Sequence, residues 1–490
     1  MNQFNPGLVK KISIDWLYSL SLGLVFSIVL FYNAAVISGL SSFSYIGLLG
    51  ILITVSILYW MLPDTFSRIF FLVSLTICLP MISHPVEMLP HNVHEAIKNL
   101  IVYGDRIQIR FIILTLISFY LFFEISLKLS LKQSNYLLYL TIFTTLLLIV
   151  VFSHEYNGYS ILQVILDLGQ ILVGAAIFCY FRASPNESFS LNRIEALVQT
   201  TFSFLCLILL IDICITLSGI VSWTVSWRGG IQGLFFAFEG PYAYTIGIAL
   251  AYFLARMNYL SFVFLIILIL GATVLILTNI KSAVAALLAA SLLMPLLKYK
   301  ALNKLAFPIV VLFISLLVFY LLNSEETNSV AARFGTYITY VFTWIEGSNW
   351  IFGIKPGVTE FSGPANLSNA LFASDFASNL FGVNENLIEE LLVRDGFAEG
   401  GAFLPHNAFL SLTSSYGIIL LIPSAYYYLY LPWLILKNTN PSNKLIHSLS
   451  SVIIFIALYS FLHPMIILVP LVFFVEILRF FSLEKLASAR

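Results

Sequence analysis

The sequence predicts an all-α integral membrane protein, a multi-pass bundle of about 14 transmembrane helices. Three observations predict this fold class. Sixty per cent of the 490 residues are apolar and only 10% are charged, whereas about 25% are charged in a typical soluble protein. Apolar stretches of roughly 20 residues, the length that a helix needs to cross the hydrocarbon core, recur along the chain. Lys and Arg concentrate in alternate connecting loops, as in a chain that crosses the membrane repeatedly.

The expected membrane spans follow one another in the order of the apolar stretches. They cover residues 17–37, 44–62, 69–84, 108–127, 135–153, 161–181, 198–220, 241–257, 260–278, 281–298, 304–322, 408–434, 445–463 and 465–483. Lys10 and Lys11 precede the first stretch, and no small-residue cleavage site follows it. The first stretch is therefore expected to be a retained anchor rather than a removed signal peptide.

The distribution of basic residues predicts that both termini are cytoplasmic. With the N-terminus inside, every short inner loop is basic, and sixteen of the 24 Lys and Arg residues lie on the inner side. These sixteen are Lys10, Lys11, Arg68, Lys128, Lys132, Arg182, Arg193, Arg256, Lys298, Lys300, Lys304, Lys437, Lys444, Arg479, Lys485 and Arg490. The other eight, which include Arg228, Lys281 and Arg333, are assigned to the outer side or to its boundary with the membrane.

The overall charge and the cysteines exclude several classes of function. The 24 basic residues balance 24 acidic residues, so nucleic acid is not an expected partner, because its recognition needs a basic excess. All four cysteines lie inside apolar runs, where cysteine behaves as a small hydrophobic residue. Neither a disulfide scaffold nor a cysteine-ligated zinc site is expected.

Two outer segments are longer than simple connectors, and they divide the chain. Residues 1–322 are expected to hold the first eleven spans, with an outer loop at 221–240, and residues 406–490 the last three. Residues 323–405 are too long for a passive link and are expected to form a folded cap. Inside the cap, an amphipathic helix is expected from the three- and four-residue spacing of Val330, Phe334, Tyr337, Val341 and Trp344.

Three expected helices begin at the outer face, each next to a basic or titratable residue. Arg228 precedes the span that opens at Pro241, Lys281 opens the tenth span, and His406 opens the twelfth. A helix N-terminus exposes unpaired N–H groups and a partial positive charge, which favour phosphate. A pocket made this way would suit the diphosphate of a lipid-linked donor.

Four stretches carry a resemblance to a known family. The strongest is Pro405-His406-Asn407-Ala408-Phe409-Leu410 followed by Gly417, and the others are Arg228 to Tyr242, Thr278 to Ala283, and Arg333-Phe334-Gly335 through Trp350-Ile351-Phe352-Gly353. Together they resemble the bacterial O-antigen ligase and O-antigen polymerase superfamily, over roughly residues 200 to 435.

This resemblance implies a GT-C-like, metal-independent glycosyltransferase in the bacterial inner membrane, with a periplasmic active site and no cofactor. It implies that His406 is the general base on the acceptor hydroxyl and that Arg333 holds the leaving diphosphate. Arg228, Lys281 and Asn407 are implied to bind the substrate or its diphosphate. Lys281 stands where the family commonly has Arg, which loses the bidentate fork, so Arg228 would take more of the phosphate binding.

Within this superfamily, the long cap favours a polymerase that joins lipid-linked repeat units en bloc. Expected partners are an undecaprenyl-diphosphate-linked oligosaccharide, an acceptor glycan, the lipid bilayer, a chain-length regulator and a flippase. One alternative is a ligase that transfers polymer to lipid A-core. A second is a secondary transporter or flippase, because Glu124, Asp167, Asp212 and Glu476 lie within or at the ends of expected spans, although structural pairing between helices would also explain them.

A group of histidines and acids in the first outer loop has the composition of a metal site. His84, His91 and His94 share the loop with Glu87 and Glu95. The spacing of His91 and His94 is compatible with ligation, but a solvated polar loop explains the same residues. No metal site is therefore expected.

Overall fold

The computed structural model describes most of the membrane-length segments and little of the long connectors. The described residues are 16–29, 32, 41–78, 84–85, 102–103, 106–107, 109–132, 134–153, 158–183, 191–217, 239–256, 262–278, 280–298, 337–338, 340–342, 344–345, 349–353, 359–360, 372, 375–376, 379, 402–403, 407–438, 444–462 and 468–488.

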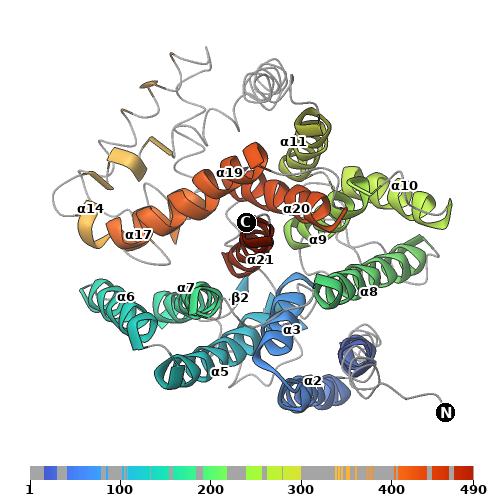
Figure 1. Cartoon of the computed structure of the whole chain (residues 1–490), viewed down its shortest axis with the longest axis horizontal. Coiled ribbons are helices and arrows are strands. Elements are labelled where there is room, and N and C mark those ends of the chain that lie inside the picture. Colours follow the sequence, from blue (N-terminus) through green and yellow to red (C-terminus); the bar gives the residue numbers. More distant parts are fainter. Residues whose placement is uncertain are drawn as a thin grey trace. The chain divides into compact units, whose positions relative to one another are not determined.

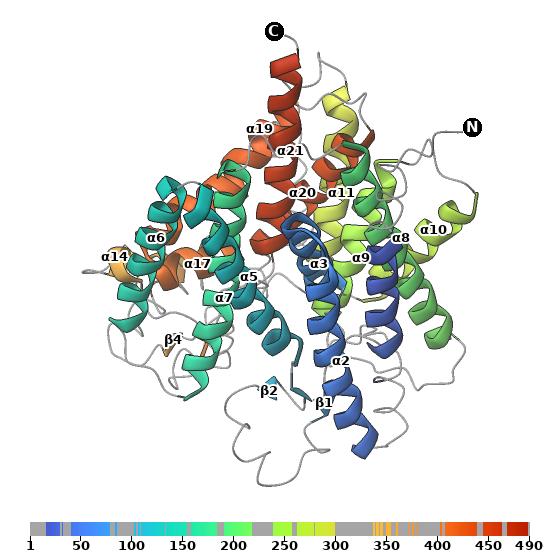
Figure 2. The ribbon, with the colours of Figure 1, turned by 60° about the horizontal axis from the view of Figure 1, so that its bottom comes forward.

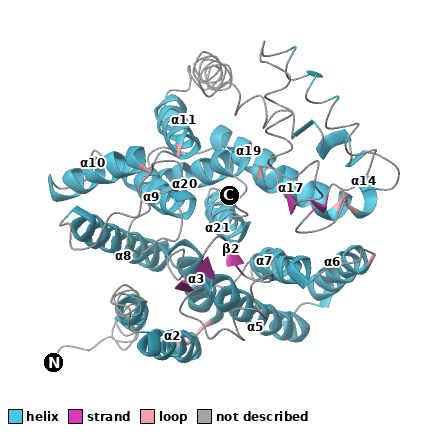
Figure 3. Ribbon diagram, turned by 180° about the vertical axis from the view of Figure 1, so that it is seen from behind, coloured by secondary structure: helices cyan, strands magenta, loops and turns pink. Residues whose placement is uncertain are grey.

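Helices make up nearly all of this described chain (Figure 3). Residues 16–29 are helical, and the helices after them are α2 (Ser41–Met61), α3 (Thr65–Cys78), α5 (Ile109–Lys132), α6 (Ser134–Phe152), α7 (Gly158–Ala183), α8 (Leu191–Leu217), α9 (Glu239–Leu254), α10 (Phe262–Leu277), α11 (Lys281–Lys298), α14 (Asn349–Phe352), α17 (Ala408–Tyr416), α18 (Ile418–Ala425), the π-helix η3 (Tyr426–Tyr430), α19 (Leu431–Asn438), α20 (Lys444–Leu462) and α21 (Leu468–Ser488). Every expected span overlaps one of these helices except residues 304–322, which lie outside the described residues.

The strands that are described have two residues each and form two small antiparallel sheets. One sheet has the order β1 (His84–Pro85), β3 (Arg106–Ile107) and β2 (Val102–Tyr103), and the other pairs β4 (Thr359–Glu360) with β5 (Ala402–Phe403). The expected third span at 69–84 was therefore too long at its end, because His84 lies in a strand.

The length and surface of the helices are those of a helical membrane protein. Four helical segments among the described residues are long and apolar enough to cross a membrane, and shorter apolar helices accompany them. On α6, the large apolar side chains of Leu138, Ile142, Leu146 and Ile149 recur on one face and are 44–56% exposed. A continuous apolar face of this kind is unfavourable in water and favourable in lipid.

The chain divides into two compact units. Unit 1 comprises Met1–Leu137, Leu168–Val284 and Leu468–Arg490, and unit 2 comprises Leu138–Asp167 and Ala285–Ile467. In unit 1, α3 packs against α5, α8 and α21 (Figure 1). Phe66, Phe70, Phe181 and Phe473 join α3, α7 and α21 in an aromatic core in which each side chain is at most 2% exposed. Helices α8, α9 and α10 form a second group in the same unit (Figure 2).

In unit 2, α17 and α19 pack against α20, and α14 packs against α17 and α18. The expected twelfth span at 408–434 was predicted as one helix, but Gly417 divides it. Gly417 has a φ of 64° and a ψ of −154°, a conformation that essentially only glycine adopts. As a result, the segment long enough to cross a membrane begins at Ile418, after the short helix α17.

Candidate functional site

The structure describes two of the five residues that the sequence predicts for the site. Arg228, Arg333 and His406 lie outside the described residues. Asn407 lies in unit 2 and Lys281 in unit 1, and the two units are described separately.

Asn407 is the N-cap residue of α17. Its backbone is extended, with a φ of −155° and a ψ of 110°, and its side-chain Oδ1 accepts a hydrogen bond of 2.9 Å from the backbone N–H of Leu410. Its backbone carbonyl accepts from the N–H of Ser411 at 2.9 Å. Asn is among the preferred residues at this position because it satisfies an N–H group that the helix leaves open. The cap fixes the direction in which the chain enters α17, directly after His406, and leaves the Nδ2 hydrogens of Asn407 as donors.

Lys281 is the first residue of α11, and its side chain is exposed. The turn before it is fixed by Thr278, whose buried hydroxyl donates to the carbonyl of Leu275 at 2.7 Å and accepts from the N–H of Ile280 at 3.4 Å. A cation at a helix N-terminus is disfavoured by the helix dipole by about 0.3–1 kcal/mol. An anion at this position would interact favourably with both the ammonium group and the open end of the helix.

Two of the four motif stretches meet in unit 2. Gly353, which ends the Trp350-to-Gly353 stretch, has a φ of 86°, and a Cβ atom there would overlap the backbone carbonyl of Ser415. A Cβ atom at Gly417 would in turn overlap the backbone carbonyl of Ile351. The two backbones are therefore in direct contact, which requires glycine on both sides. The contact joins the predicted cap to the helix that follows His406.

The helix expected around Arg333 is only partly described. Residues 337–338, 340–342 and 344–345 are helical, in agreement with the expected periodicity. Its buried side chain is Tyr340, at 1% exposed, whereas Val341, which was expected on the apolar face, is 42% exposed. Tyr337 and Trp344, which were also expected on the apolar face, are half-buried on the same side as Tyr340.

Glu124 is bonded to several side chains in unit 1. Its carboxylate accepts hydrogen bonds from Arg68 Nη1 at 2.6 Å, Tyr59 OH at 2.9 Å and Thr65 Oγ1 at 3.2 Å. Lys128 Nζ lies 3.7 Å away on the same helix. These partners come from α2, α3 and α5, so Glu124 links three helices of unit 1.

Two further acids in expected spans are each bonded to a tyrosine. In unit 2, the hydroxyl of Tyr416, at the end of α17, donates to Asp167 Oδ2 of α7 at 3.3 Å. In unit 1, the hydroxyl of Tyr242, in the first turn of α9, is hydrogen-bonded to Asp212 of α8. Both carboxylates are at most 4% exposed. Each pair therefore anchors a helix that follows an expected outer segment.

Glu476 is fully buried in α21 and lies between two arginines. Arg479 Nε donates to Glu476 Oε2 at 2.7 Å, and Arg182 Nε of α7 lies 3.6 Å from the same oxygen. All four acids that the sequence singled out thus have a described partner. This pattern supports the structural pairing of helices that was the alternative to a transport role.

A further polar group surrounds the turn between α2 and α3, outside the apolar segments. Asp64 accepts hydrogen bonds from the backbone N–H of Ser67 at 2.9 Å and from Arg193 Nη2 at 2.5 Å. Burial alone would raise the pKa of the Asp64 carboxyl, but the hydrogen bonds from Ser67 and Arg193 outweigh it and lower that pKa below 3.8. Asp64 is therefore held as a carboxylate that ties α8 to this turn.

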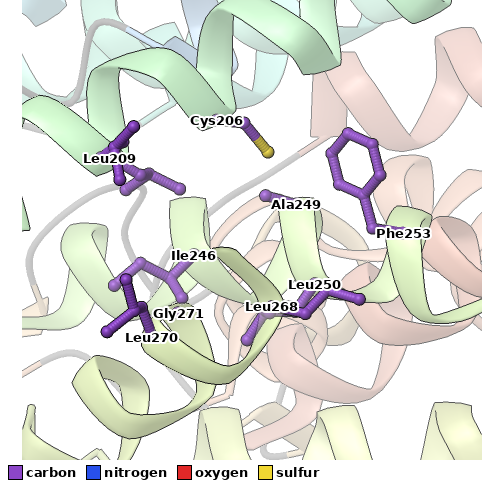
Figure 4. A pocket seen from close by; sticks show the side chains of 10 residues that line it. Cys206, Leu209, Ile246, Ala249, Leu250, Phe253, Leu268, Leu270 and Gly271 are labelled. Carbon is purple, nitrogen blue, oxygen red and sulfur yellow. The ribbon is translucent and has the colours of Figure 1, made fainter. Parts of the chain in front are cut away.

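A small apolar cavity lies between α8, α9 and α10 in unit 1 (Figure 4). Leu209, Ile246, Leu250 and Phe253 contribute to its lining, and its volume is about 20 Å³. This is the space of about one or two water molecules. The cavity is too small for a sugar or a diphosphate and does not serve as the predicted site.

Among the residues that the structure describes, no group of three His, Cys, Asp or Glu side chains could hold a metal ion. His84 lies in β1, while His91 and His94 fall outside the described residues. Comparison of the chain with protein-family models, curated proteins and solved structures finds no match. The fold and the contacts described above are therefore the basis of any assignment.

Sequence reasoning missed two features of this region. It treated Asn407 as a substrate ligand, although an Asn before an apolar helix is also a typical N-cap signal. It noted Gly353 and Gly417 in separate stretches without connecting them. No local signal connects them, because their contact depends on how distant parts of unit 2 pack.

Proposed function

We propose that the protein is a membrane-embedded glycosyltransferase that polymerises undecaprenyl-diphosphate-linked glycan repeat units. The observation that carries the proposal is the backbone contact of Gly353 with Gly417 in unit 2. Both glycines belong to stretches that resemble the O-antigen ligase and polymerase superfamily. A shared site needs these stretches to be close together, so their contact supports the proposal.

In the proposed reaction, the acceptor hydroxyl oxygen attacks the anomeric carbon of the donor glycan. The bond from this carbon to the diphosphate oxygen breaks, and undecaprenyl diphosphate leaves. His406 accepts the hydroxyl proton. Arg333 and Arg228 stabilise the negative charge on the leaving group, with Lys281 as a further cation. Because cations meet the diphosphate, it leaves without being protonated.

The long segment between the two glycines favours a polymerase within the superfamily. Residues 354–416 lie between Gly353 and Gly417 in the sequence, and β4 pairs with β5 across much of that segment. The sheet brings residue 403 back beside residue 359, shortly before His406. Such a closed segment could hold a growing chain near the base.

The direct test uses purified protein in detergent with lipid-linked repeat units. Longer lipid-linked chains are expected without any other acceptor. Product that forms only when lipid A-core is supplied would make the protein a ligase, and uptake or flipping in vesicles without either product would make it a transporter.

Two variants test the assigned roles. His406→Ala is expected to lose transfer while donor binding persists, and Arg333→Ala is expected to weaken donor binding. His447→Ala, in α20, is the matched control and is expected to keep transfer. Wild-type turnover by His406→Ala would exclude His406 as the base, and unaltered binding and rate in Arg333→Ala would remove Arg333 from the site.

A further inference from the structure

A surface of basic and aromatic side chains lies where α2 and α5 pack together in unit 1. The rings of Trp60 and Tyr120 are 4.9 Å apart between centroids and tilted by 60°. The guanidinium carbon of Arg68 lies 5.6 Å from the ring centroid of Tyr59 and 5.8 Å from that of Trp60. Cations at these distances are attracted to the ring faces. Tyr59, Trp60 and Tyr120 thus form a group of neighbouring aromatic rings, with the guanidinium group of Arg68 next to it.

This surface carries an excess positive charge. Arg68 and Lys128 both pair with the single carboxylate of Glu124, so one positive charge is left over. The guanidinium group of Arg68 is held by protein groups, because it also donates from Nε to the carbonyl of Leu62 at 2.9 Å. The ammonium group of Lys128 is held less closely. Its Nζ lies 3.7 Å from Glu124, beyond hydrogen-bonding distance, and its side chain is 45% exposed.

Further hydrogen-bond donors lie on the same surface, within two turns of Lys128 along α5. An ammonium group carries three N–H donors, an indole one and a tyrosine hydroxyl one. Trp60 is 59% exposed, and within the described chain neither its indole N–H nor the hydroxyl of Tyr120 has a hydrogen-bond partner. Tyr120, Glu124 and Lys128 follow one another at four-residue spacing, so they occupy one face of α5.

Large apolar side chains surround these donors. Ile57 and Met61 of α2 are 52% and 53% exposed, and Phe123 and Leu127 of α5 are 63% and 67% exposed. A partner must therefore offer an anionic or oxygen-rich group to the donors and hydrocarbon to the apolar residues. A phospholipid with a negatively charged headgroup meets both demands at once.

We propose that the α2–α5 surface, defined by Trp60, Tyr120 and Lys128, binds the headgroup of an anionic phospholipid. Lys128 contacts the phosphate, while Trp60 and Tyr120 donate to phosphate or ester oxygens. The hydrocarbon chains lie along Phe123 and Leu127. Arg68 and Lys128 belong to the basic residues that the sequence assigns to the cytoplasmic side, so the bound lipid belongs to the inner leaflet.

The test measures lipid binding to the purified full-length protein by native mass spectrometry. Phosphatidylglycerol is expected to bind more tightly than phosphatidylcholine. Lys128→Gln is expected to weaken phosphatidylglycerol binding by about fivefold, the effect of one basic residue at an anionic surface, and to leave phosphatidylcholine binding unchanged. Lys128→Arg is expected to retain the preference because it keeps the charge.

Two further variants complete the design. Lys444→Gln removes an exposed lysine at the start of α20, and it is expected to bind phosphatidylglycerol like the wild type. Trp60→Phe keeps an aromatic ring next to Tyr120 but removes the N–H donor, and it is expected to weaken phosphatidylglycerol binding less than Lys128→Gln does.

A competition experiment separates a lipid site from a site for free phosphate. Inorganic phosphate is expected not to displace the bound phosphatidylglycerol.

Several results would overturn the proposal. Among them are equal affinity for the two lipids, an unchanged preference in both Lys128→Gln and Trp60→Phe, and displacement of phosphatidylglycerol by inorganic phosphate. A preference lost equally in Lys444→Gln would also overturn it, because the effect would then depend on total charge rather than on this surface. None of these readouts depends on glycosyl transfer.

Discussion

Gly353 and Gly417 contact each other's backbone segments in unit 2, and each has a positive φ, 86° and 64° respectively. The carbonyl groups of Ser415 and Ile351 occupy the space that a Cβ atom would need at either position. The contact holds the turn after α14 against the break between α17 and α18. It therefore fixes where α17 ends, and with it the helix whose first turn follows His406.

Gly417→Ala is expected to destabilise the protein. The backbone conformation alone should cost about 1–3 kcal/mol, and the overlap with Ile351 adds to this cost. The midpoint of thermal unfolding in detergent measures the effect. Gly50→Ala is the control, because a Cβ atom there meets only Ile28 Cγ2 at 4.0 Å, and it is expected to be neutral or slightly stabilising. Equal melting of the two variants would contradict the described contact.

Asn407 variants should separate its capping role from a role in binding substrate. Asn407→Ala is expected to destabilise the protein by about 1 kcal/mol, because α17 loses its cap. Asn407→Ser keeps a capping oxygen and should restore stability, but it lacks the amide donors. Donor-binding assays on both variants complete the test. If the serine variant recovers stability but not donor binding, Asn407 also contacts the substrate; if it recovers both, Asn407 acts only as a cap.

Removal of the Glu124 carboxylate should strongly lower the stability of the protein to unfolding, because its main partner, Arg68, is largely buried. The side chains of Arg68 and Glu124 are 16% and 14% exposed, and Glu124→Ala is expected to cost about 3–5 kcal/mol. The double variant Arg68→Met with Glu124→Leu should have a higher melting temperature than Glu124→Ala, since no unpaired buried charge remains: Lys128, the other partner of Glu124, is 45% exposed. Glu195→Ala, whose partner is Arg256 and whose side chain is 39% exposed, should cost about 0–1 kcal/mol. Similar losses at Glu124 and Glu195 would refute this ranking.

Asp64 should contribute to the pH dependence of stability. Its folded-state pKa is lowered below the ordinary value of 3.8, so its contribution is present above that value. The contribution is lost as the pH falls through the lower folded-state pKa. Asp64→Asn should therefore have a lower melting temperature than the wild type at neutral pH. Plotted against pH, the melting temperatures of the two proteins should converge in acid. Asp375→Asn, at an exposed position, should follow the wild type throughout, and a constant offset between wild type and Asp64→Asn would contradict the assignment.

Apolar length was enough to predict most of the helices, because a run of about 20 apolar residues has few alternatives to a helix in lipid. Apolar length did not predict correctly where two of the helices end. Hydropathy extended the third span to His84, which lies in β1, and it joined α17 to α18 because Gly417 lies in an otherwise continuous run. In the second case a single residue with an unusual backbone conformation ends the helix.

The candidate site was less predictable than the fold. The four acids could be singled out because an ionised group is costly in a span, but their partners depend on packing. Tyr416 and Asp167 are bonded although they lie far apart in the sequence. For Asn407, only a binding role was expected from the sequence, and the structure describes it as the N-cap of α17.

The π-helix η3 accommodates an additional residue in the chain before α19. Leu431 donates its N–H to the carbonyl of Tyr426, five residues back, so this turn contains one residue more than an α-helical turn. The five residues of this turn rotate the chain about as far as four residues of an α-helix do. A deletion of one residue between Tyr426 and Tyr430 would therefore convert η3 into an ordinary α-helical turn while the same side of α19 stays packed on α20, and Leu431, which is 4% exposed, would stay buried. The π-turn thus accommodates one additional residue without changing the register of the last part of unit 2.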